Sequence, residues 1–331
     1  SPEIDKLFSH ILGLINSQLL ICPYSSVHKT ETHQLRHSNK DKLWELIKRS
    51  SRGHEFIPAD KIKHKQIYQA FDVFVSSPNK YISIETETGN AFYRDVNKWD
   101  DYFHIDIKMP QKEEESAEVR GLKERANCEL IKLLPIWRED NTSFDEDIKN
   151  ELWGQKQNYI KAFFDMTANL NNGNLDGVLN SPVDAFVIRD LLDYDKDKLS
   201  LDERIKRIID FFNSEQFNKI PYESISASLY SVPRKRVKQG HYQNSEKAKK
   251  KLKGVFFDVK FIAAYTPYCD AMFLDNVMFD YVASPELKLG KRYKTRFFSR
   301  NSLPEFEEYL NSIEENKTQQ LEQALQVVGF K

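Results

Sequence analysis

Apolar positions at the start of the chain recur at helical spacing. Between residues 3 and 20 they return every three or four positions, which predicts an amphipathic helix. The apolar run at residues 18–23 (QLLICP) predicts a short buried strand, and a second helix is expected to begin at Ser25 or Ser26. The first 35 residues therefore indicate helix, strand and helix in that order.

The long middle of the chain is mostly helical in pattern, acidic and poor in glycine. A short extended piece is expected at residues 80–85, and no internal repeat supports a solenoid. The segments with helical spacing are residues 41–49, 59–74, 111–134, 145–170, 183–192 and 201–212.

The pattern changes after Pro221. A helix is predicted from Val259 to Tyr265, and the apolar runs at residues 271–274 and 295–299 predict two strands. A closing helix is expected at residues 301–313. Alternating strands and helices are typical of a parallel sheet covered by helices. We therefore expect one α/β domain formed by residues 1–35 and 219–331, split by a largely helical insertion at 36–218.

Composition excludes several functional classes. The chain has 331 residues, 49 basic and 50 acidic, and its 11 glycines never form G-x-G, which excludes a dinucleotide fingerprint and a phosphate-binding P-loop. No apolar run approaches the roughly 20 residues needed to cross a bilayer, so no membrane partner is expected. Three cysteines without C-x-x-C spacing favour neither a zinc cage nor disulfides, and a reducing, cytoplasmic setting is the simplest inference.

Basic residues are concentrated in residues 234–300. This window holds 16 Lys and Arg against six Asp and Glu, so it is +10 while the rest of the chain is −11. A local basic field is typical of nucleic-acid contact, RNA being favoured here over DNA, although a solvated basic loop has the same pattern. The candidates for phosphate contact are Arg234, Lys235, Arg236, Lys238, Lys249, Lys250, Lys251, Lys253, Lys291, Arg292 and Arg296.

Three acidic residues stand at strand ends or helix starts. Asp275 follows the strand predicted at 271–274, Asp258 opens a helix, and Glu31 lies on the helix after the first predicted strand. Groups at the carboxyl ends of parallel strands meet at one edge of a sheet. Such a cluster would hold Mg²⁺ or Mn²⁺, which activate water and offset charge on a phosphodiester. Taken singly, Asp258 is also read as a helix cap, Asp275 as a turn residue and Glu31 as a surface residue.

Residues 258–275 resemble the third and fourth acidic motifs of PIN-domain nucleases, and residues 20–31 are similar to the second motif. The closing strand and helix at 295–310 match as well. The resemblance implies a three-layer α/β/α PIN-like domain with a central, mainly parallel sheet. It also implies that Glu31, Asp258 and Asp275 bind the metal, with Asp270 as an accessory acid. The implied activity is a metal-dependent nuclease, first an endoribonuclease, in a family that includes toxins, RNA-processing enzymes and defence effectors.

One family feature has no match. PIN domains begin with a strand that ends in Asp, whereas this chain starts at Ser1 in or just before its first helix. Either that acid lies ahead of Ser1, or the protein works with a reduced acid set. The alternative function is therefore a non-catalytic PIN-like module, whose acidic insertion contacts a partner protein and whose basic edge holds RNA or DNA.

Overall fold

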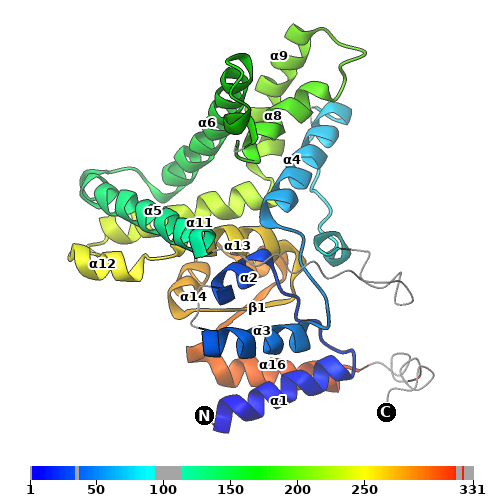
Figure 1. The fold of residues 1–331 in the computed structure, drawn as a ribbon, viewed down its shortest axis with the longest axis vertical. Coiled ribbons are helices and arrows are strands. Elements are labelled where there is room, and N and C mark those ends of the chain that lie inside the picture. The colour runs from blue at the N-terminus through cyan, green and yellow to red at the C-terminus, as the bar shows by residue number, and fades with distance from the viewer. Residues whose placement is uncertain are drawn as a thin grey trace.

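The computed structural model describes residues 2–33, 37–78, 80–93, 113–179, 181–317 and 323. Over these ranges the chain is mainly helical, with one small sheet (Figure 1). The helices before the sheet are α1 (Pro2–Asn16), α2 (Ser26–His33), α3 (His37–Ser51), α4 (Ala59–Ser76), η1 (Thr88–Ala91), α5 (Glu113–Glu139), α6 (Phe144–Asn171), α7 (Leu175–Leu179), α8 (Asp184–Asp193), α9 (Leu201–Phe212), α10 (Glu215–Asn218), α11 (Pro221–Lys238), α12 (Ser245–Lys251), α13 (Val255–Tyr265) and η3 (Thr266–Tyr268).

The sheet consists of two parallel strands of four residues each. Strand β1 (Ala271–Leu274) pairs with β2 (Arg296–Ser299), and Leu274 is opposite Ser299 in the register. Phe273 points away from the main core and contacts the Phe306 ring at 5.2 Å between centroids. The elements that follow β1 are α14 (Asn276–Val282), α15 (Leu289–Tyr293), η4 (Arg300–Ser302) and α16 (Leu303–Glu315).

Helix α11 runs through the middle of the molecule, between α4, α6, α8 and α9 on one side and α13, α14 and β1 on the other (Figure 1). Most of its side chains are buried, including several serines, and the rest are half-buried. Three of these serines donate to carbonyls within the helix, as when Ser228 Oγ donates to the Ser224 carbonyl at 2.7 Å, while Ser224 Oγ accepts from Arg292. A buried helix can therefore carry serine without leaving polar atoms unpaired.

Two large hydrophobic clusters and a small one, formed by Ala162, Met166 and Ala185, make up the core of the described residues. Of the two large clusters, the larger combines side chains of α4, α5, α11, α12, α13, β1 and α14, and the smaller combines α4, α6, α8, α9 and α10. Helix α4 belongs to both, through Ile62 in the larger cluster and Phe71 in the smaller. The larger cluster thus contains residues both of the predicted insertion, 36–218, and of the segment that follows it. The boundaries of the insertion stay a prediction.

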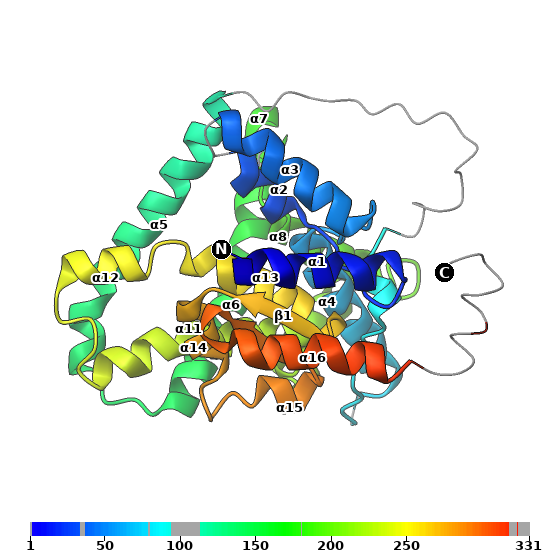
Figure 2. The same cartoon turned by 90° about the horizontal axis from the view of Figure 1, so that it is seen from below.

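The first and the last of the long described helices lie together. Lys6 of α1 donates to Glu307 of α16 at 3.3 Å, and His10 lies 3.7 Å from Glu314 (Figure 2). The aromatic face of α16 also covers β1 and β2, through the contacts of Phe306 with the sheet. The two ends of the chain therefore share one unit around the small sheet.

The predicted three-layer α/β/α fold is wrong. Within the described ranges there are two short strands and no central sheet between helical layers. The expected strand at residues 18–23 does not form, because Ile21 is 53% exposed and only Tyr24 makes an isolated bridge, to Glu55. A short apolar run there is not buried enough to pair as a core strand. The extended piece expected at 80–85 pairs with no strand either.

Other local predictions are confirmed. The strands expected at 271–274 and 295–299 appear as β1 and β2, and the helix expected at 301–313 appears as α16. The first helix and most of the middle helices also form. Helix α13 begins at Val255, four residues before the expected start at Val259, so Asp258 lies in its first turn rather than at its cap.

Candidate functional site

Asp258 is held at the beginning of α13. The helix is preceded by Gly254, whose left-handed backbone (φ 93°) lets the chain turn from α12 into α13. The Asp258 amide donates to the Gly254 carbonyl at 3.1 Å. The carboxylate lies back over the glycine, with Oδ2 only 3.4 Å from the position of an added Cβ. Gly254 therefore adopts a backbone conformation that other residues rarely adopt. Because it has no side chain, it also leaves room for the Asp258 carboxylate.

Asp275 and Glu31 come from two other elements. Asp275 follows β1 and caps α14, its Oδ1 accepting a hydrogen bond from the Met278 amide at 2.7 Å. Glu31 lies on α2, and its Oε1 accepts from Lys123 Nζ at 3.3 Å. Both residues are exposed, whereas Asp258 is half-buried.

These three carboxylates share one electrostatic environment. The pKa of Asp258 is raised to about 7, first by burial and then by the negative charges of Asp275 and Glu31, while Lys123 acts in the opposite direction. Like charges raise a carboxyl pKa only when they are close. The fold thus places Asp275 and Glu31, which are far from each other in the sequence, where the charge of each acts on Asp258.

Asp270 does not join this group. It precedes β1, at the opposite end of the strand from Asp275, and its carbonyl accepts from the Arg296 amide at 2.8 Å. Its exposed carboxylate lies near Cys269 and Tyr309, whose pKa values its charge helps to raise after the larger effect of burial. The strand therefore separates Asp270 from the other three acids.

Lys123 is the neighbour of the acids that sequence reasoning missed. It projects from α5, its side chain is 14% exposed, and its Nζ lies 4.8 Å from the centre of the Phe257 ring. In the sequence, Lys123 follows many other charged residues, and nothing in that pattern distinguishes it from them. The available signal is helical spacing, because Asn127, Leu130 and Leu134 are buried on the same face of α5 and Lys123 continues that face by one turn.

His28 is a second neighbour, on α2 with Glu31. Its Nδ1 accepts from the Ser25 amide at 3.0 Å, and its ring meets the Phe261 ring edge-on. Burial lowers the pKa of His28, with the charge of Glu31 opposing the shift. His28 therefore places a half-buried imidazole on the same helix as Glu31.

The chemistry of these donors fits a hard cation. Mg²⁺ and Mn²⁺ prefer carboxylate oxygen, and Mg²⁺ is commonly held by one or two carboxylates completed by water and substrate phosphate. Within the ranges described, no three His, Cys, Asp or Glu side chains stand close enough to enclose a metal ion. A cation here would accordingly rest on fewer protein oxygens, with the remaining positions open to water.

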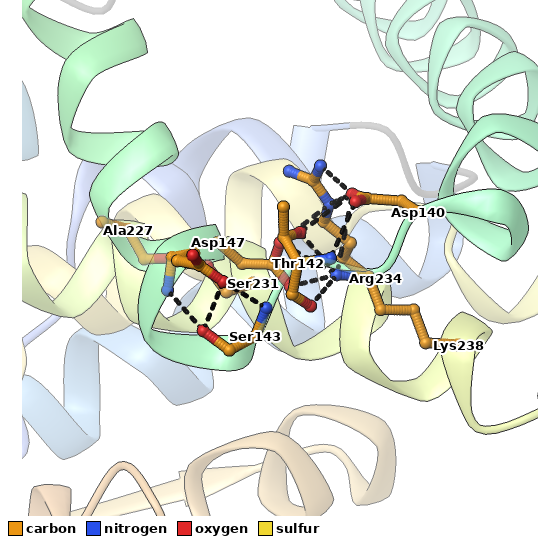
Figure 3. Close-up of polar contacts among 9 residues, drawn as sticks. Asp140, Thr142, Ser143, Asp147, Ala227, Ser231, Arg234 and Lys238 are labelled. Carbon is orange, nitrogen blue, oxygen red and sulfur yellow. Dashed lines mark hydrogen bonds and ion pairs between the residues drawn. The ribbon is translucent and has the colours of Figure 1, made fainter.

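Two of the predicted phosphate contacts have partners inside the protein. Arg234 and Lys238 lie on α11 and point into the loop between α5 and α6 (Figure 3). Arg234 Nε is 2.9 Å from Asp140 and 3.1 Å from Asp147, and Lys238 Nζ is 2.9 Å from Asp147. The Thr142 amide, then Arg234 and the Thr142 hydroxyl, lower the pKa of Asp140. This network fastens the α5–α6 connection to α11.

Other basic candidates are also engaged. Lys235 pairs with Glu286, and the Arg236 guanidinium donates to the Asp280 carbonyl at 3.0 Å. Arg292 donates to Ser224 Oγ at 2.9 Å and Arg296 lies over the Tyr309 ring, while the described part of the chain offers the exposed Lys291 no ion pair.

The lysines of α12 and the following turn differ from these. Among the described residues, the side chains of Lys249, Lys250, Lys251 and Lys253 make no hydrogen bond or ion pair, and the last three are exposed. Asn127 of α5 anchors this segment by donating to the Lys249 carbonyl at 2.8 Å. In the sequence, Lys253 is five positions before Asp258.

Comparisons with known proteins give no relatives: no family model, curated protein or solved structure matches the chain. Inside the described ranges, no helix is both long and apolar enough to span a membrane. Function is therefore inferred from the side chains themselves.

Proposed function

We propose that the chain is a divalent-cation-dependent nuclease, with RNA as its first substrate class, and that Glu31, Asp258 and Asp275 form its site. The observation that carries the proposal is that half-buried Asp258 has a pKa of about 7, raised by burial and by the charges of Asp275 and Glu31. Placing like charges together away from water lowers the stability of a fold, and such arrangements are enriched at functional sites.

A divalent cation would relieve this repulsion. Because the three acids do not enclose an ion, oxygens of no more than two of Glu31, Asp258 and Asp275, completed by water, would hold Mg²⁺ or Mn²⁺. When bound, the cation supplies an activated water and neutralises charge on a phosphodiester. The proposal does not depend on the three-layer fold, which the chain lacks, because it follows from the acids alone.

Phosphate binding is assigned to the lysines of α12 and the turn after it, which come shortly before Asp258 in the sequence. Lys249, Lys250, Lys251 and Lys253 have no internal partners among the described residues. Contacts of this kind hold the nucleic-acid backbone in position without reading the bases. Arg234 and Lys238 are left out of this role, since Asp140 and Asp147 already occupy their charged groups.

The second candidate is a nucleic-acid-binding module without catalysis. Two observations favour it: Lys123 already neutralises Glu31, and the described residues hold no enclosed three-ligand metal group. In this function the α12 lysines would still bind RNA, and the acids would be structural.

The deciding experiment compares the wild-type protein with Asp258→Asn and Asp270→Asn. Labelled single-stranded RNA and DNA are incubated with Mn²⁺, and the melting temperature is measured with and without Mn²⁺. The nuclease proposal expects a Mn²⁺-dependent rise in melting temperature and cleavage of RNA, both lost in Asp258→Asn and kept in Asp270→Asn. Binding of RNA without cleavage or Mn²⁺ response would instead support the binding module.

A further inference from the structure

A groove lies between one face of α4 and the start of α8. Side chains at helical spacing along α4 form one wall, and Val183, the N-cap residue of α8, forms the other. Its volume is about 480 Å³, within the range of about 300–1,000 Å³ that small-ligand sites occupy. It lies on the α4 side of α11, whereas the elements that carry Asp258 and Asp275 lie on the other side (Figure 1). The α4 residues that line it are Lys61, His64, Lys65, Tyr68 and Gln69.

Ion pairs between the two helices hold the walls of the groove together. The buried Lys63 of α4 pairs with Asp184, the first residue of α8, and His64 Nε2 lies 3.1 Å from Asp190 of the same helix. Asp60 on α4 is a further 3.9 Å neighbour of Lys63. These three carboxylates are thus matched to Lys63 and His64. A site held in this way is preformed, which lowers the cost of ordering it around a ligand.

Two ammonium groups remain for a ligand. Lys61 and Lys65 are exposed and lie one turn apart on α4. Among the described residues, the Lys61 side chain makes no hydrogen bond or ion pair, and Lys65 donates to a neutral group, Asn90 Oδ1, at 3.2 Å. A phosphate monoester carries a charge of about −1.5 to −2 near pH 7, which matches two lysines, whereas a carboxylate carries only one negative charge.

The Tyr68 ring gives the groove an aromatic surface. It is 41% exposed, and it contacts the ring of Tyr194 at 5.7 Å between centroids. The Tyr194 hydroxyl donates to Asp72 of α4, so the support of the Tyr68 ring is itself fixed. Exposed aromatic rings beside cations are the means by which proteins stack nucleobases. The next residue, Gln69, adds an amide that can donate to and accept from the edge of a base.

We propose that this groove binds a free nucleoside monophosphate, with the base on the Tyr68 ring and the phosphate between Lys61 and Lys65. A nucleotide inside a strand offers only singly charged phosphodiesters, so the pair of lysines favours the free nucleotide over RNA. The inference does not rest on the proposed nuclease function, because the groove shares no residue with the predicted acids or with the lysines of α12.

The test measures binding of adenosine 5′-monophosphate to the full chain by calorimetry, without added Mn²⁺. Adenosine and inorganic phosphate are measured separately, because each carries only one of the two groups that the groove recognises. The variants are the double change Lys61→Gln with Lys65→Gln, and the single changes Tyr68→Ala and Tyr68→Phe.

The control variants remove the same groups elsewhere. Lys149→Gln with Lys196→Gln changes two exposed lysines, of α6 and of the α8–α9 loop. Tyr81→Ala removes a ring that is 40% exposed, close to the exposure of Tyr68, and that does not line the groove. Thermal denaturation without ligand identifies a variant that fails to fold, and Tyr68→Leu then replaces Tyr68→Ala.

The wild type is expected to bind adenosine 5′-monophosphate at one site, and adenosine and phosphate each at least about tenfold more weakly. The double lysine variant should lose at least about tenfold in affinity for the nucleotide while its binding of adenosine stays unchanged. Tyr68→Ala should lose at least about fivefold, because the stacking surface is gone, and Tyr68→Phe should retain the affinity. Both control variants should match the wild type.

The inference is overturned if the nucleotide shows no saturable binding, if adenosine binds as tightly as the nucleotide, or if the control variants lose as much affinity as the groove variants. A single-stranded RNA with a 5′-phosphate is added in competition. If it displaces the nucleotide at a lower concentration than unlabelled nucleotide does, the occupant is a strand and the inference fails as well.

Discussion

Tyr159 of α6 donates its hydroxyl hydrogen to Glu223 Oε1 of α11 at 2.5 Å, and both side chains are almost completely buried. The charged groups nearby are Lys63 of α4, which lies over the Tyr159 ring, and its ion-pair partner Asp184 of α8. Burial raises the pKa of Glu223 to about 7, although Lys63 and the Tyr159 hydroxyl act against the shift. A titratable carboxyl thus sits where α4, α6, α8 and α11 meet.

Glu223→Gln is expected to remove part of the pH dependence of stability. The folded pKa of about 7 exceeds the ordinary 4.5, so the folded state retains a proton that the unfolded state releases. The stability contribution is complete below pH 4.5 and is lost as the pH rises to 7. Glutamine keeps the acceptor for Tyr159 and cannot ionise. The stability difference between Glu223→Gln and the wild type should therefore shift in favour of the variant by about 3 kcal/mol between low pH and pH 8.

Urea denaturation from about pH 4 to about pH 8 measures this effect, with Glu129→Gln as the surface control. Glu129 is paired with Lys132 in solvent and should show no such trend. Parallel pH profiles for Glu223→Gln and the wild type would contradict a raised pKa at Glu223.

Asp258→Asn is expected to stabilise the protein above pH 7 in the absence of metal. The charged carboxylate is disfavoured by burial and by Asp275 and Glu31, so its removal relieves repulsion of on the order of 1–3 kcal/mol. Well below the ordinary pKa of 3.8 the acid is protonated in both folded and unfolded states, and the gain should vanish. Asp270→Asn, at the far end of β1, should give no comparable gain in the same urea titrations.

Local features were the most predictable from the sequence. Strands β1 and β2 and the placements of Asp258 and Asp275 depend on short apolar runs and on helix starts, which neighbouring residues determine. The extent of the sheet was not predictable in this way, because pairing depends on a partner distant in sequence. The apolar residues 20–23 stay outside the sheet although their composition suits a strand.

Ion pairs between residues far apart in the sequence explain why the charge pattern alone did not identify the available cations. Arg234 and Lys238 belong to the basic window, but the fold gives them Asp140 and Asp147, about 90 residues earlier in the chain. Lys123 lies in a charged run of α5. Only the buried residues that follow it on the helix show that it lies on the inward face. Charge counts identify a basic segment, while burial decides which of its members stay available to a ligand.

Asp147→Asn is expected to destabilise the protein strongly. Its side chain is 1% exposed and receives both Arg234 and Lys238, so the change leaves two largely buried cations with less counter-charge. Breaking a buried ion pair on one side typically costs about 3–5 kcal/mol. Asp145→Asn, two residues earlier and exposed, is the control and should lose less than about 1 kcal/mol. Equal losses in thermal denaturation would show that the network in Figure 3 contributes little.

Gly254→Ala is expected to destabilise by about 1–2 kcal/mol, because alanine is strained at a φ of 93°. Its Cβ would also lie 3.4 Å from Asp258 Oδ2, so the position of the carboxylate is tested together with the turn. Gly154→Ala is the matched control. Gly154 lies within α6 with open space around it, and there alanine should stabilise by about 0.5–1 kcal/mol. A neutral Gly254→Ala would show that this turn does not require glycine.

The triple variant Lys250→Gln, Lys251→Gln and Lys253→Gln is expected to weaken RNA binding and to reduce its dependence on salt. Each lysine that neutralises a phosphate of a single strand releases counterions, so the slope of log K against log[salt] should become shallower by about 0.7 for each phosphate that is no longer neutralised. Binding of a labelled single-stranded RNA is measured from low to moderate salt without Mn²⁺, which separates binding from cleavage. The control replaces Lys149, Lys196 and Lys206, exposed residues of α6, the α8–α9 loop and α9, and removes the same charge. If both triple variants lose affinity equally, the attraction comes from overall charge; a selective loss in the α12 variant assigns the phosphate binding to the lysines that precede Asp258.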